Sequence, residues 1–267
     1  NALYNGPYFS TLVYGAATAS ETRQHQLIFA DGKHSADDEK QAIDYLVRMK
    51  CAGIIVYPEF LTPAELDDII ATSAVPIVVL NRTLERHPEC CFGVRHYDSA
   101  RLIVDFIVHM GHKDVAFISG KPCSPTNRMR RLAWEDGLRQ NGITPDDSLV
   151  IEGDWSMESG YKAAGELLKR QCAFTAILAG NDDMALGAMK ALQDNGYCIP
   201  GDISVAGFDN ARVSAFVSPA LTTINIPLAA MAQQAVEHLL AISHTNPSSH
   251  LLAGDLIIRD SVAHPRG

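Results

Sequence analysis

Short apolar runs rich in β-branched residues alternate along this sequence with longer segments whose apolar residues recur every three or four positions. Each short run is typical of a strand buried on both faces, and each longer segment of an amphipathic helix. This alternation predicts parallel sheets with helices on both faces, connected by right-handed crossovers. The predicted strands are Gln26–Ala30, Gly53–Tyr57, Pro76–Leu80, Val115–Ser119, Thr175–Ala179, Ile203–Ala206 and Asp255–Ile258.

The predicted helices carry their own start and stop signals. Thr62-Pro63-Ala64-Glu65 is a capping box with proline at the first helical position. An apolar stripe over residues 102–110 stops at Gly111. A second stripe, over residues 185–192, ends at Asn195-Gly196. We therefore expect each helix to be bounded by local sequence rather than by packing alone.

Two sheets fit this pattern better than one. The first series of strands runs to Leu80, and an irregular stretch, 81–95, leads into the second series. We predict another irregular crossing at 222–227, then a helix over 228–242, a polar loop and a last strand. The predicted fold is α/β with two doubly wound parallel-sheet lobes, formed by residues 1–94 with 226–250 and by 95–225 with 251–267. A hinged cleft between such lobes is a natural small-molecule site.

Composition restricts the class of partner. The 267 residues are 47% hydrophobic and 20% charged, which suits a globular chain with two cores. The net charge of −9 and the lack of a Lys/Arg cluster predict that this chain alone does not bind nucleic acid. Its apolar runs are too short to span a bilayer, and no signal peptide stands at the start, so we expect no membrane partner.

Several kinds of chemistry have no motif in this sequence. The six cysteines lack C-x-x-C spacing, so we expect neither a zinc site nor a redox pair, and a reduced, cytoplasmic compartment is the economical inference. Phosphate-cradling glycine loops, a G-x-S-x-G elbow and H-E-x-x-H are missing. Neighbouring carboxylates such as Asp182-Asp183 point to different sides of a helix. We therefore predict no cofactor, no metal and no catalytic activity.

Polar side chains recur where the predicted strands end. Asn81 follows one strand, Asn181 and Asp182 follow another, and Asp209 follows a third. The structural interpretation is that Asn181 caps a helix and that the aspartates interact favourably with the helix dipole. The functional interpretation is that these groups bind a ligand, because ligands lie beyond the carboxyl ends of strands in open parallel sheets.

Arginine and aromatic side chains stand at similar places. Arg130 follows the loop after Val115–Ser119, and Trp155 follows another strand. An amide, an arginine fork and a carboxylate suit vicinal hydroxyls, while Trp155, Tyr8 and Phe9 offer flat apolar faces to a sugar ring. Each residue could instead have a structural role: Trp155 could be a core residue, for example, and Arg131 could lie on a solvated helix face. Together, at matching strand ends, they favour a sugar site.

Four segments make the sequence resemble the LacI/GalR family of bacterial repressors. They are "NDDMALGAMKAL", "GDISVAGFDN", "PALTTI" and "LIIRDS", which occur in the family's order and spacing. The resemblance covers essentially all 267 residues. Within the family, "ADGKHSADDEKQAIDYL" and "IIVYPEFL" are most similar to repressors of operons for β-glucosides such as arbutin, salicin and cellobiose.

This resemblance implies a periplasmic-binding-protein-like core of type I, hinged by three crossings, that dimerises and binds a sugar-like effector between its lobes. The residues that match effector contacts include Arg130, four residues before Trp134, and Asn81, at a position where the family often has Asp or Asn. The segment around Tyr8 is expected in the loop after the first strand. The resulting ligand-binding set is Tyr8, Phe9, Asn81, Arg130, Trp155, Asn181 and Asp209.

Three departures from the family pattern stand out. The helix-turn-helix and hinge helix that precede the family's core are absent here, so operator DNA is expected as a partner only through that missing N-terminal domain. The first strand of the family's sheet should lie just before Asn1. Ile226 stands where some relatives have a glutamine contact, so one hydrogen bond to the sugar is lost.

We therefore predict the effector-binding core of a sugar-responsive transcriptional regulator. The alternative is a soluble sugar receptor of a transport system, against which the unpaired cysteines, the missing signal peptide and the "LIIRDS" ending count. An enzyme of unknown type is the third reading. We also predict a homodimer with contacts on both lobes, at Tyr45, Phe60 and Leu61 in the first and around Val213–Val217, including Phe216, in the second.

Overall fold

The computed structural model describes residues 7–170, 172–240 and 250–266. The chain divides into two compact units. Unit 1 comprises the residues up to Val94 together with Pro227–Leu252, and unit 2 comprises Arg95–Ile226 together with the residues from Ala253 onward. The chain therefore passes from one unit to the other three times, and each unit is built from two separate stretches of sequence.

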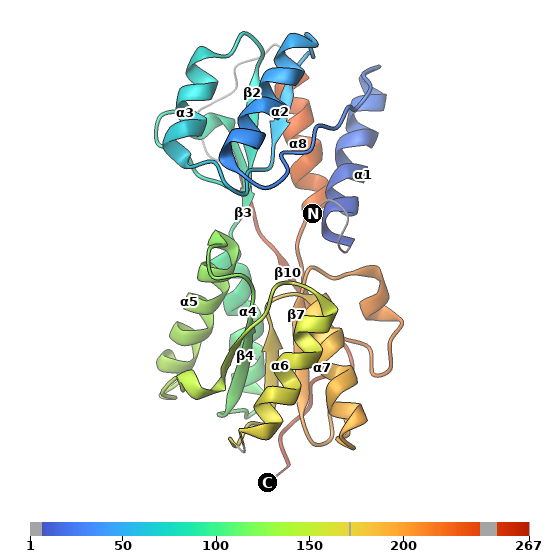
Figure 1. Ribbon diagram of the computed structural model, residues 1–267. Helices are drawn as coiled ribbons and strands as arrows, with labels where there is room; N and C mark the ends of the chain where they lie inside the picture. Colours follow the sequence, from blue (N-terminus) through green and yellow to red (C-terminus); the bar gives the residue numbers. More distant parts are fainter. Residues whose placement is uncertain (1–6, 171, 241–249, 267) are drawn as a thin grey trace. The chain divides into compact units, whose positions relative to one another are not determined.

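Unit 1 holds a parallel sheet with the strand order β1-β2-β3-β9 (Figure 1). Its register pairs Ile54 with Ile77 and Phe92 with His250. The strands are Ile54–Val56 (β1), Ile77–Leu80 (β2), Cys91–Val94 (β3) and His250–Leu252 (β9). The helices are Pro7–Thr22 (α1), Ala36–Arg48 (α2), Pro63–Thr72 (α3) and Leu228–Leu240 (α8), with a 3-10 turn at Pro88–Cys90 (η2).

Different helices cover the two faces of this sheet. Ile77 and Val79 of β2 pack in one apolar cluster with Ile43 of α2 and Leu66 of α3. Because side chains alternate along a strand, the residues between them face the opposite side. On that side α8 packs against β1, β2 and β3, and α1 packs against α8. The strands β1, β2 and β3 thus lie between two helix layers.

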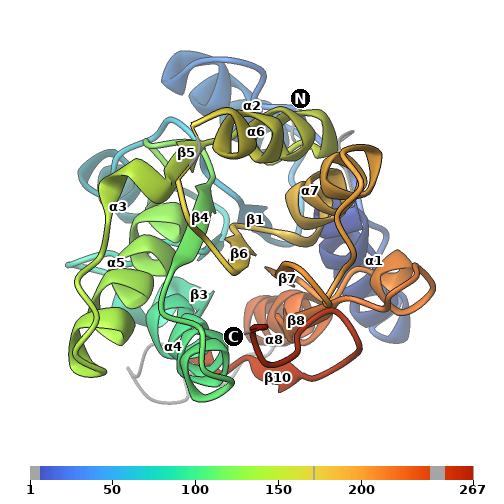
Figure 2. The same ribbon diagram turned by 90° about the horizontal axis from the view of Figure 1, so that it is seen from below.

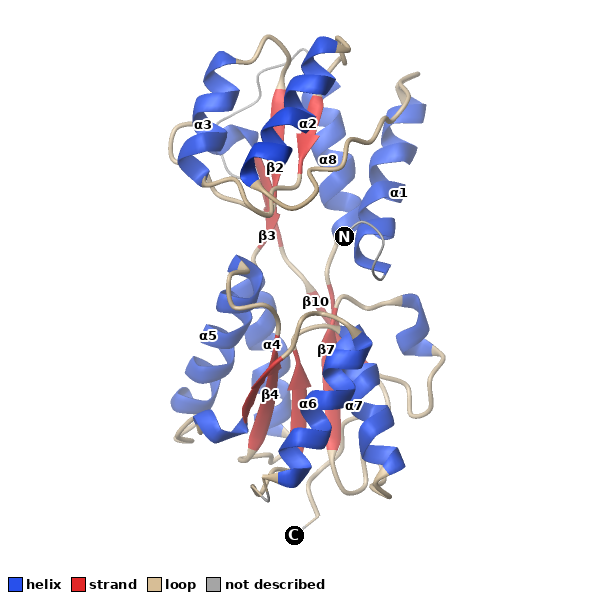
Figure 3. Cartoon of the chain, viewed as in Figure 1, coloured by secondary structure: helices blue, strands red, loops and turns tan. Residues whose placement is uncertain are grey.

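Unit 2 holds a larger sheet with the order β10-β8-β7-β6-β4-β5 (Figure 3). All neighbouring pairs are parallel except β10 and β8, which are antiparallel. The strands are Val115–Ser119 (β4), Val150–Glu152 (β5), Ala176–Ala179 (β6), Ser204–Phe208 (β7), Thr222–Asn225 (β8) and Asp255–Ile257 (β10). The helices are His96–His109 (α4), Pro125–Gln140 (α5), Met157–Lys169 (α6) and Asp182–Asp194 (α7), with 3-10 turns at Asp147–Leu149 (η3) and Arg212–Ala215 (η4).

Figure 2 shows α4 and α5 on one side of this sheet and α6 and α7 on the other. The strands β4, β6 and β7 are buried at every residue. Such continuous burial requires apolar residues on both faces, which explains why these runs lack the polar alternation of a half-exposed strand. Both units therefore have the predicted α/β architecture.

Local signals bound the helices as the sequence predicts. Thr62 and Glu65 form the expected capping box at the start of α3. Asn181 is the N-cap of α7, since its Oδ1 accepts the backbone N–H of Met184 at 2.9 Å. The interpretation of Asn181 as a helix cap is therefore confirmed, and its role in ligand binding stays a prediction. The last two residues of the predicted helix 228–242, and the polar loop after it, lie outside the described residues.

Several predicted elements were wrong. Gln26–Ala30 is irregular, because β1 ends the sheet on that side and no described strand pairs with these residues; Ile28 and Phe29 are about half exposed. The stretches predicted as irregular contain β3 and β8, which form because each has a strand on both sides to pair with. Strand β9 was also missed.

The placement of Tyr8 and Phe9 in a loop was wrong as well. Both lie in the first turns of α1, which the sequence did not predict as a helix. Pro7 starts this helix with its φ already fixed, and small residues such as Ala16 let it pack closely against α8.

Candidate functional site

The carboxyl ends of four neighbouring parallel strands in unit 2 carry most of the predicted site residues. Arg130 lies on α5, the helix that follows β4, and Trp155 follows β5. Asn181 follows β6, and Asp209 follows β7. Because these strands are parallel neighbours, their carboxyl ends meet at one edge of the sheet.

Arg130 is the buried centre of this edge. Ser124 caps α5, and its helical course places the Arg130 side chain inside the unit, where 1% of the residue is exposed. The guanidinium lies over the ring of Phe208 at 4.3 Å from the ring centroid. It donates one hydrogen bond to the Asp209 carboxylate at 3.0 Å and another to the Gly180 carbonyl oxygen. Arg130 thus ties the ends of β6 and β7 to α5.

Asp209 is the acidic partner in this pair. Burial raises the pKa of its carboxyl group, while the charge and the hydrogen bond of Arg130 act in the opposite direction. The pair lies out of water, with 2% of the Arg130 side chain and 11% of the Asp209 side chain exposed. A ligand hydroxyl that reached Asp209 would therefore meet a carboxylate already held in place.

The turn that carries Asp209 is strained. Asp209 has φ 99° and Asn210 has φ 49°, a region that costs non-glycine residues about 1–3 kcal/mol each. Several contacts hold the turn. The Asp209 N–H donates to the Ile224 carbonyl oxygen at 2.8 Å, and Arg259 donates to Asn210 Oδ1 at 2.6 Å. Backbone strain that surroundings maintain in this way is common where a side chain must be aimed at a ligand.

Asp182 holds the same turn from the other side. Its carboxylate accepts the Ala211 N–H at 2.8 Å and the hydroxyls of Ser214 and Thr223, each at 2.6 Å. The sequence placed Asp182 at a strand end, but we did not count it among the ligand residues. Only 1% of it is exposed, so its role is internal.

Asn181 and Trp155 are joined directly. Asn181 Nδ2 donates to the Trp155 carbonyl oxygen at 2.9 Å. Trp155 has φ 77°, and its indole lies against Gly120, where a Cβ would be 2.1 Å from the ring. The indole also packs against the core of unit 2 and remains partly exposed. Trp155 is therefore part core residue and part available aromatic surface.

In unit 1 the predicted residues gather around one that the sequence analysis missed. Tyr57 follows β1, donates its hydroxyl to Tyr8 Oη at 3.3 Å, and accepts a hydrogen bond from Asn81 Nδ2 at 3.1 Å. Its ring meets those of Tyr8 and Phe9 edge to face, at centroid distances of 6.2 and 4.9 Å. Tyr57 ends the run Gly53–Tyr57, and this strand-end position was the signal that could have identified it.

Two other polar residues, both on α5 of unit 2, have structural roles. Arg131 pairs with Glu135 at 3.0 Å and with Asp147 at 2.8 Å. It lies on a partly exposed helix face, as the structural alternative predicted. Asn127 Oδ1 accepts the Gly120 N–H at 2.7 Å. Ile226, which stands where some relatives have a glutamine contact, is 3% exposed.

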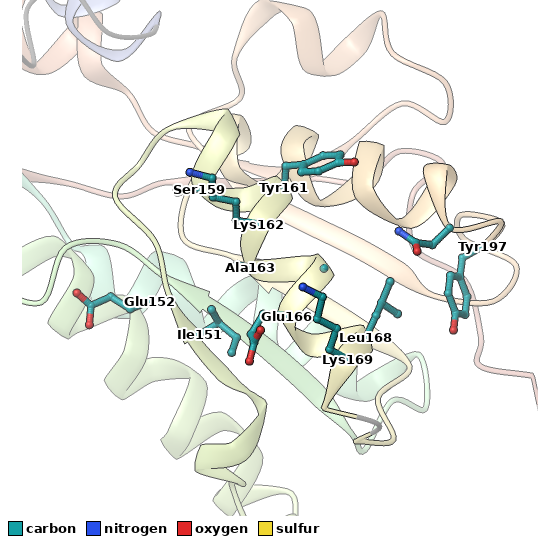
Figure 4. Close-up of a pocket in the computed structure, with 12 residues that line it drawn as sticks. Ile151, Glu152, Ser159, Tyr161, Lys162, Ala163, Glu166, Leu168, Lys169 and Tyr197 are labelled. Carbon is teal, nitrogen blue, oxygen red and sulfur yellow. The ribbon is translucent and has the colours of Figure 1, made fainter.

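A surface hollow of about 850 Å³ lies elsewhere in unit 2, along α6 (Figure 4). None of the predicted ligand residues lines it. Its charged groups are mixed in sign, and Glu152 and Tyr197 stand at opposite ends of it (Figure 4). Side chains that converge on one point characterise a ligand site, so the strand-end edge is the better candidate.

Comparison with known proteins identifies the architecture. Residues 104–262 match the family model of the periplasmic binding protein-like domain. Over 267 aligned residues the chain is 39% identical to the HTH-type transcriptional regulator AscG of Escherichia coli K12, with 99% of this chain and 80% of that protein covered. The chain belongs to the LacI/GalR family of transcriptional regulators.

Solved structures of LacI-family members have the same fold. A sugar-binding transcriptional regulator of the LacI family from Escherichia coli, complexed with phosphate, superposes with a TM-score of 0.89 at 39% identity, covering 99% of this chain and 96% of that one. A dimeric Lac repressor superposes with a TM-score of 0.87 at 29% identity, covering 97% and 96%. The predicted family and fold class are both confirmed.

Family membership favours the regulator among the functions that the sequence left open. The LacI/GalR relatives are transcriptional regulators rather than enzymes, and the reading as a transport receptor is not favoured. The chain is the effector-binding core of such a regulator. Among the described residues, no helix is long and apolar enough to cross a membrane.

Proposed function

We propose that this core binds a sugar, with Arg130, Asp209, Asn181 and Trp155 as the contacts from unit 2. The buried pair between Arg130 and Asp209 carries this proposal. Its partners fix the carboxylate at the edge of the sheet before any ligand arrives, and preorganised groups bind with a smaller entropic cost. A carboxylate held in this way suits a pair of vicinal sugar hydroxyls, which are hydrogen-bond donors.

The aromatic residues suit a sugar ligand. Trp155 offers a partly exposed indole beside Asn181. Tyr8, Phe9 and Tyr57 form a second aromatic cluster in unit 1, with Asn81 beside it. Aromatic faces pack against the C–H face of a sugar ring while neighbouring amides and carboxylates bind its hydroxyls. We propose that these four residues of unit 1 complete the effector site.

A β-glucoside is the first class of sugar to test. Its support is the similarity of two segments of this sequence to repressors of β-glucoside operons, together with the 39% identity to AscG. A phosphorylated sugar is the second class, because the similar LacI-family structure from Escherichia coli was solved with phosphate. Arg130 already bonds Asp209 and Gly180, and this favours a neutral sugar over an anionic one.

We further propose that the protein acts in the cytoplasm as a homodimer that binds operator DNA through a separate N-terminal domain and controls carbohydrate use. The dimeric Lac repressor supports the assembly. Phe216 and Val213 in unit 2 and Tyr45 and Phe60 in unit 1 are exposed apolar residues that suit such an interface. Leu61, which the sequence analysis included, is 2% exposed and belongs to the core of unit 1 instead.

Calorimetry with arbutin, salicin and cellobiose tests the effector site. We expect Asp209→Asn and Asp209→Ala to weaken binding of the best sugar about ten- to a hundredfold, since each removes a charge-assisted partner worth about 1.5–3 kcal/mol. Asp147→Ala is the matched control, because it removes the carboxylate of the neighbouring surface pair with Arg131. Unchanged affinity in both Asp209 variants would exclude this site.

A further inference from the structure

Asp182 is a buried carboxylate that the proposed effector contacts do not include. It is the first residue of α7, yet its hydrogen bonds go to other segments of the unit. The Ala211 N–H and the hydroxyls of Ser214 and Thr223 all donate to it. Burying an ionisable group is costly unless it is hydrogen-bonded throughout, so these three bonds indicate a specific placement.

Two of these donors lie between a proposed ligand contact and an exposed surface. Ala211 comes two residues after Asp209, and Ser214 comes two residues before Phe216, which is 79% exposed. Ser214 itself is fully buried, and its carbonyl oxygen accepts the Leu221 N–H at 2.8 Å. The stretch from Asp209 to Phe216 is therefore anchored inside at Ala211 and Ser214, between the proposed ligand contact and the exposed Phe216 side chain.

We infer that Asp182 is a positioning residue that couples Asp209 to the exposed segment 212–216, so that a sugar bound at Asp209 changes the surface around Phe216. The Asp209 end of this coupling rests on the proposed function. Coupling requires a physical connection that both sites bias. Asp182 supplies it, because a shift of the Asp209 turn must move Ala211 and hence the carboxylate that also holds Ser214.

The role of an ordinary helix cap does not account for Asp182. Asn181 is the N-cap of α7 and accepts the Met184 N–H, whereas the bonds of the Asp182 carboxylate go to Ala211, Ser214 and Thr223. Asp183 supplies a second negative charge at the same helix end. Gly207 of β7 leaves space for the Asp182 side chain, since a Cβ there would lie 2.5 Å from the carboxylate oxygen.

The titration of Asp182 gives the protein a measurable pH dependence, which a purely steric role of this side chain would not produce. Burial raises its pKa to about 7, against the lowering effect of its hydrogen bonds from Ser214 and Thr223. The nearby carboxylate of Asp209 raises this pKa further, and Asp183 is the next residue of α7. Arg212 of η4 is exposed, and β7 and β8 contribute no titratable side chain. Near neutral pH the bonds to this carboxylate change between charge-assisted and neutral.

The test compares Asp182→Asn, Asp182→Ala and the matched control Asp183→Ala. An amide has the shape of the protonated acid and can bond all three partners, because the two hydroxyls can rotate. Hydrogen exchange of residues 211–216 and calorimetry with arbutin, salicin and cellobiose are measured at pH 6 and pH 8. We expect Asp182→Ala to speed exchange about tenfold or more and to weaken sugar binding, and Asp182→Asn to restore both.

Two further results are expected if Asp182 couples the two ends. Bound sugar should slow exchange at 212–216 in the wild type and in Asp183→Ala but not in Asp182→Ala. Protection at Ala211, corrected for intrinsic rates, should be lower at pH 8 than at pH 6 in the wild type, because the proton that stabilises the native state is lost, and should not depend on pH in Asp182→Asn. Sugar-dependent protection that persists in Asp182→Ala would overturn the inference.

The two proposals fail in different ways. If none of the three sugars binds the wild type, the proposed sugar class fails, while exchange at 211–216 in the sugar-free variants still decides whether Asp182 holds the segment. If sugar binds but exchange in Asp182→Ala equals that of Asp183→Ala, the role of Asp182 is refuted and the effector site stands.

Discussion

Arg130 and Asp209 form an ion pair at 3.0 Å in which the arginine has almost no exposed surface. Asp209→Ala leaves a guanidinium buried without its counter-charge. We expect this variant to lose about 3–5 kcal/mol in its free energy of unfolding, the usual result of breaking a buried pair from one side. Urea denaturation measures the loss. Asp147→Ala, which breaks an exposed pair, should cost at most about 1 kcal/mol, and equal losses would contradict the buried placement.

The pKa of Asp182 predicts how stability depends on pH. The native state holds this proton more tightly than the unfolded chain, because the pKa of about 7 lies above the ordinary value of 3.8. Between about pH 4 and pH 7 the native state therefore binds more protons, and the free energy of unfolding falls as pH rises. Asp182→Asn cannot titrate. The stability of the wild type relative to this variant should decline from pH 5 to pH 7.5 and level off above pH 8, whereas an increase would refute the raised pKa.

Trp155 and Gly120 give a prediction that a double-mutant cycle can test. Gly120→Ala places a Cβ 2.1 Å from the indole, so the ring must move. We expect a loss of about 1–3 kcal/mol, the typical cost of overpacking. In a Trp155→Ala background the same change should cost less, because the ring is gone. Urea denaturation measures each loss in the free energy of unfolding. If the losses of the two single variants add up in the double variant, the two residues do not touch.

Phe216 predicts the position of the dimer interface. Its 79% exposed side chain is costly in water and would be covered in a dimer. We expect Phe216→Ser to raise the dimer dissociation constant about tenfold or more, as loss of an apolar anchor does, without lowering the free energy of unfolding of the monomer. Sedimentation equilibrium measures this constant, and Tyr197→Ser, at 40% exposure, is the control. A wild type that is monomeric at micromolar concentration would refute the interface.

The sequence predicted the elements whose signals are local. The fully buried strands β4, β6 and β7 and the cap at Asn181 each depend on a few neighbouring residues. Strand β3 could not be predicted in this way, because a run of four residues containing Gly93 becomes a strand only where β2 and β9 lie on both sides. For the opposite reason Gln26–Ala30, although rich in strand formers, is not a strand: it lacks a described partner.

The same distinction applies to the candidate site. A polar residue at a strand end is visible in the sequence, which is how Asn81, Asn181 and Asp209 were selected. Which of them pair is a tertiary property, and the bond between Arg130 and Asp209 joins residues 79 positions apart. Tyr57 was missed because its strand-end position looked like the last residue of an apolar run. Its hydroxyl acquires a role only next to Tyr8 and Asn81.

Because each unit is built from two separate stretches of the chain, the order of synthesis determines when each unit can fold. The sheet of unit 1 ends in β9, so neither unit has all its strands until residues 250–257 have been synthesised. Ser261 then bonds Thr222 and Val205, which lie 39 and 56 residues earlier in the chain. A nascent chain therefore exposes incomplete sheet edges until these residues are made, and truncation before residue 250 would leave both units unfinished rather than remove one of them.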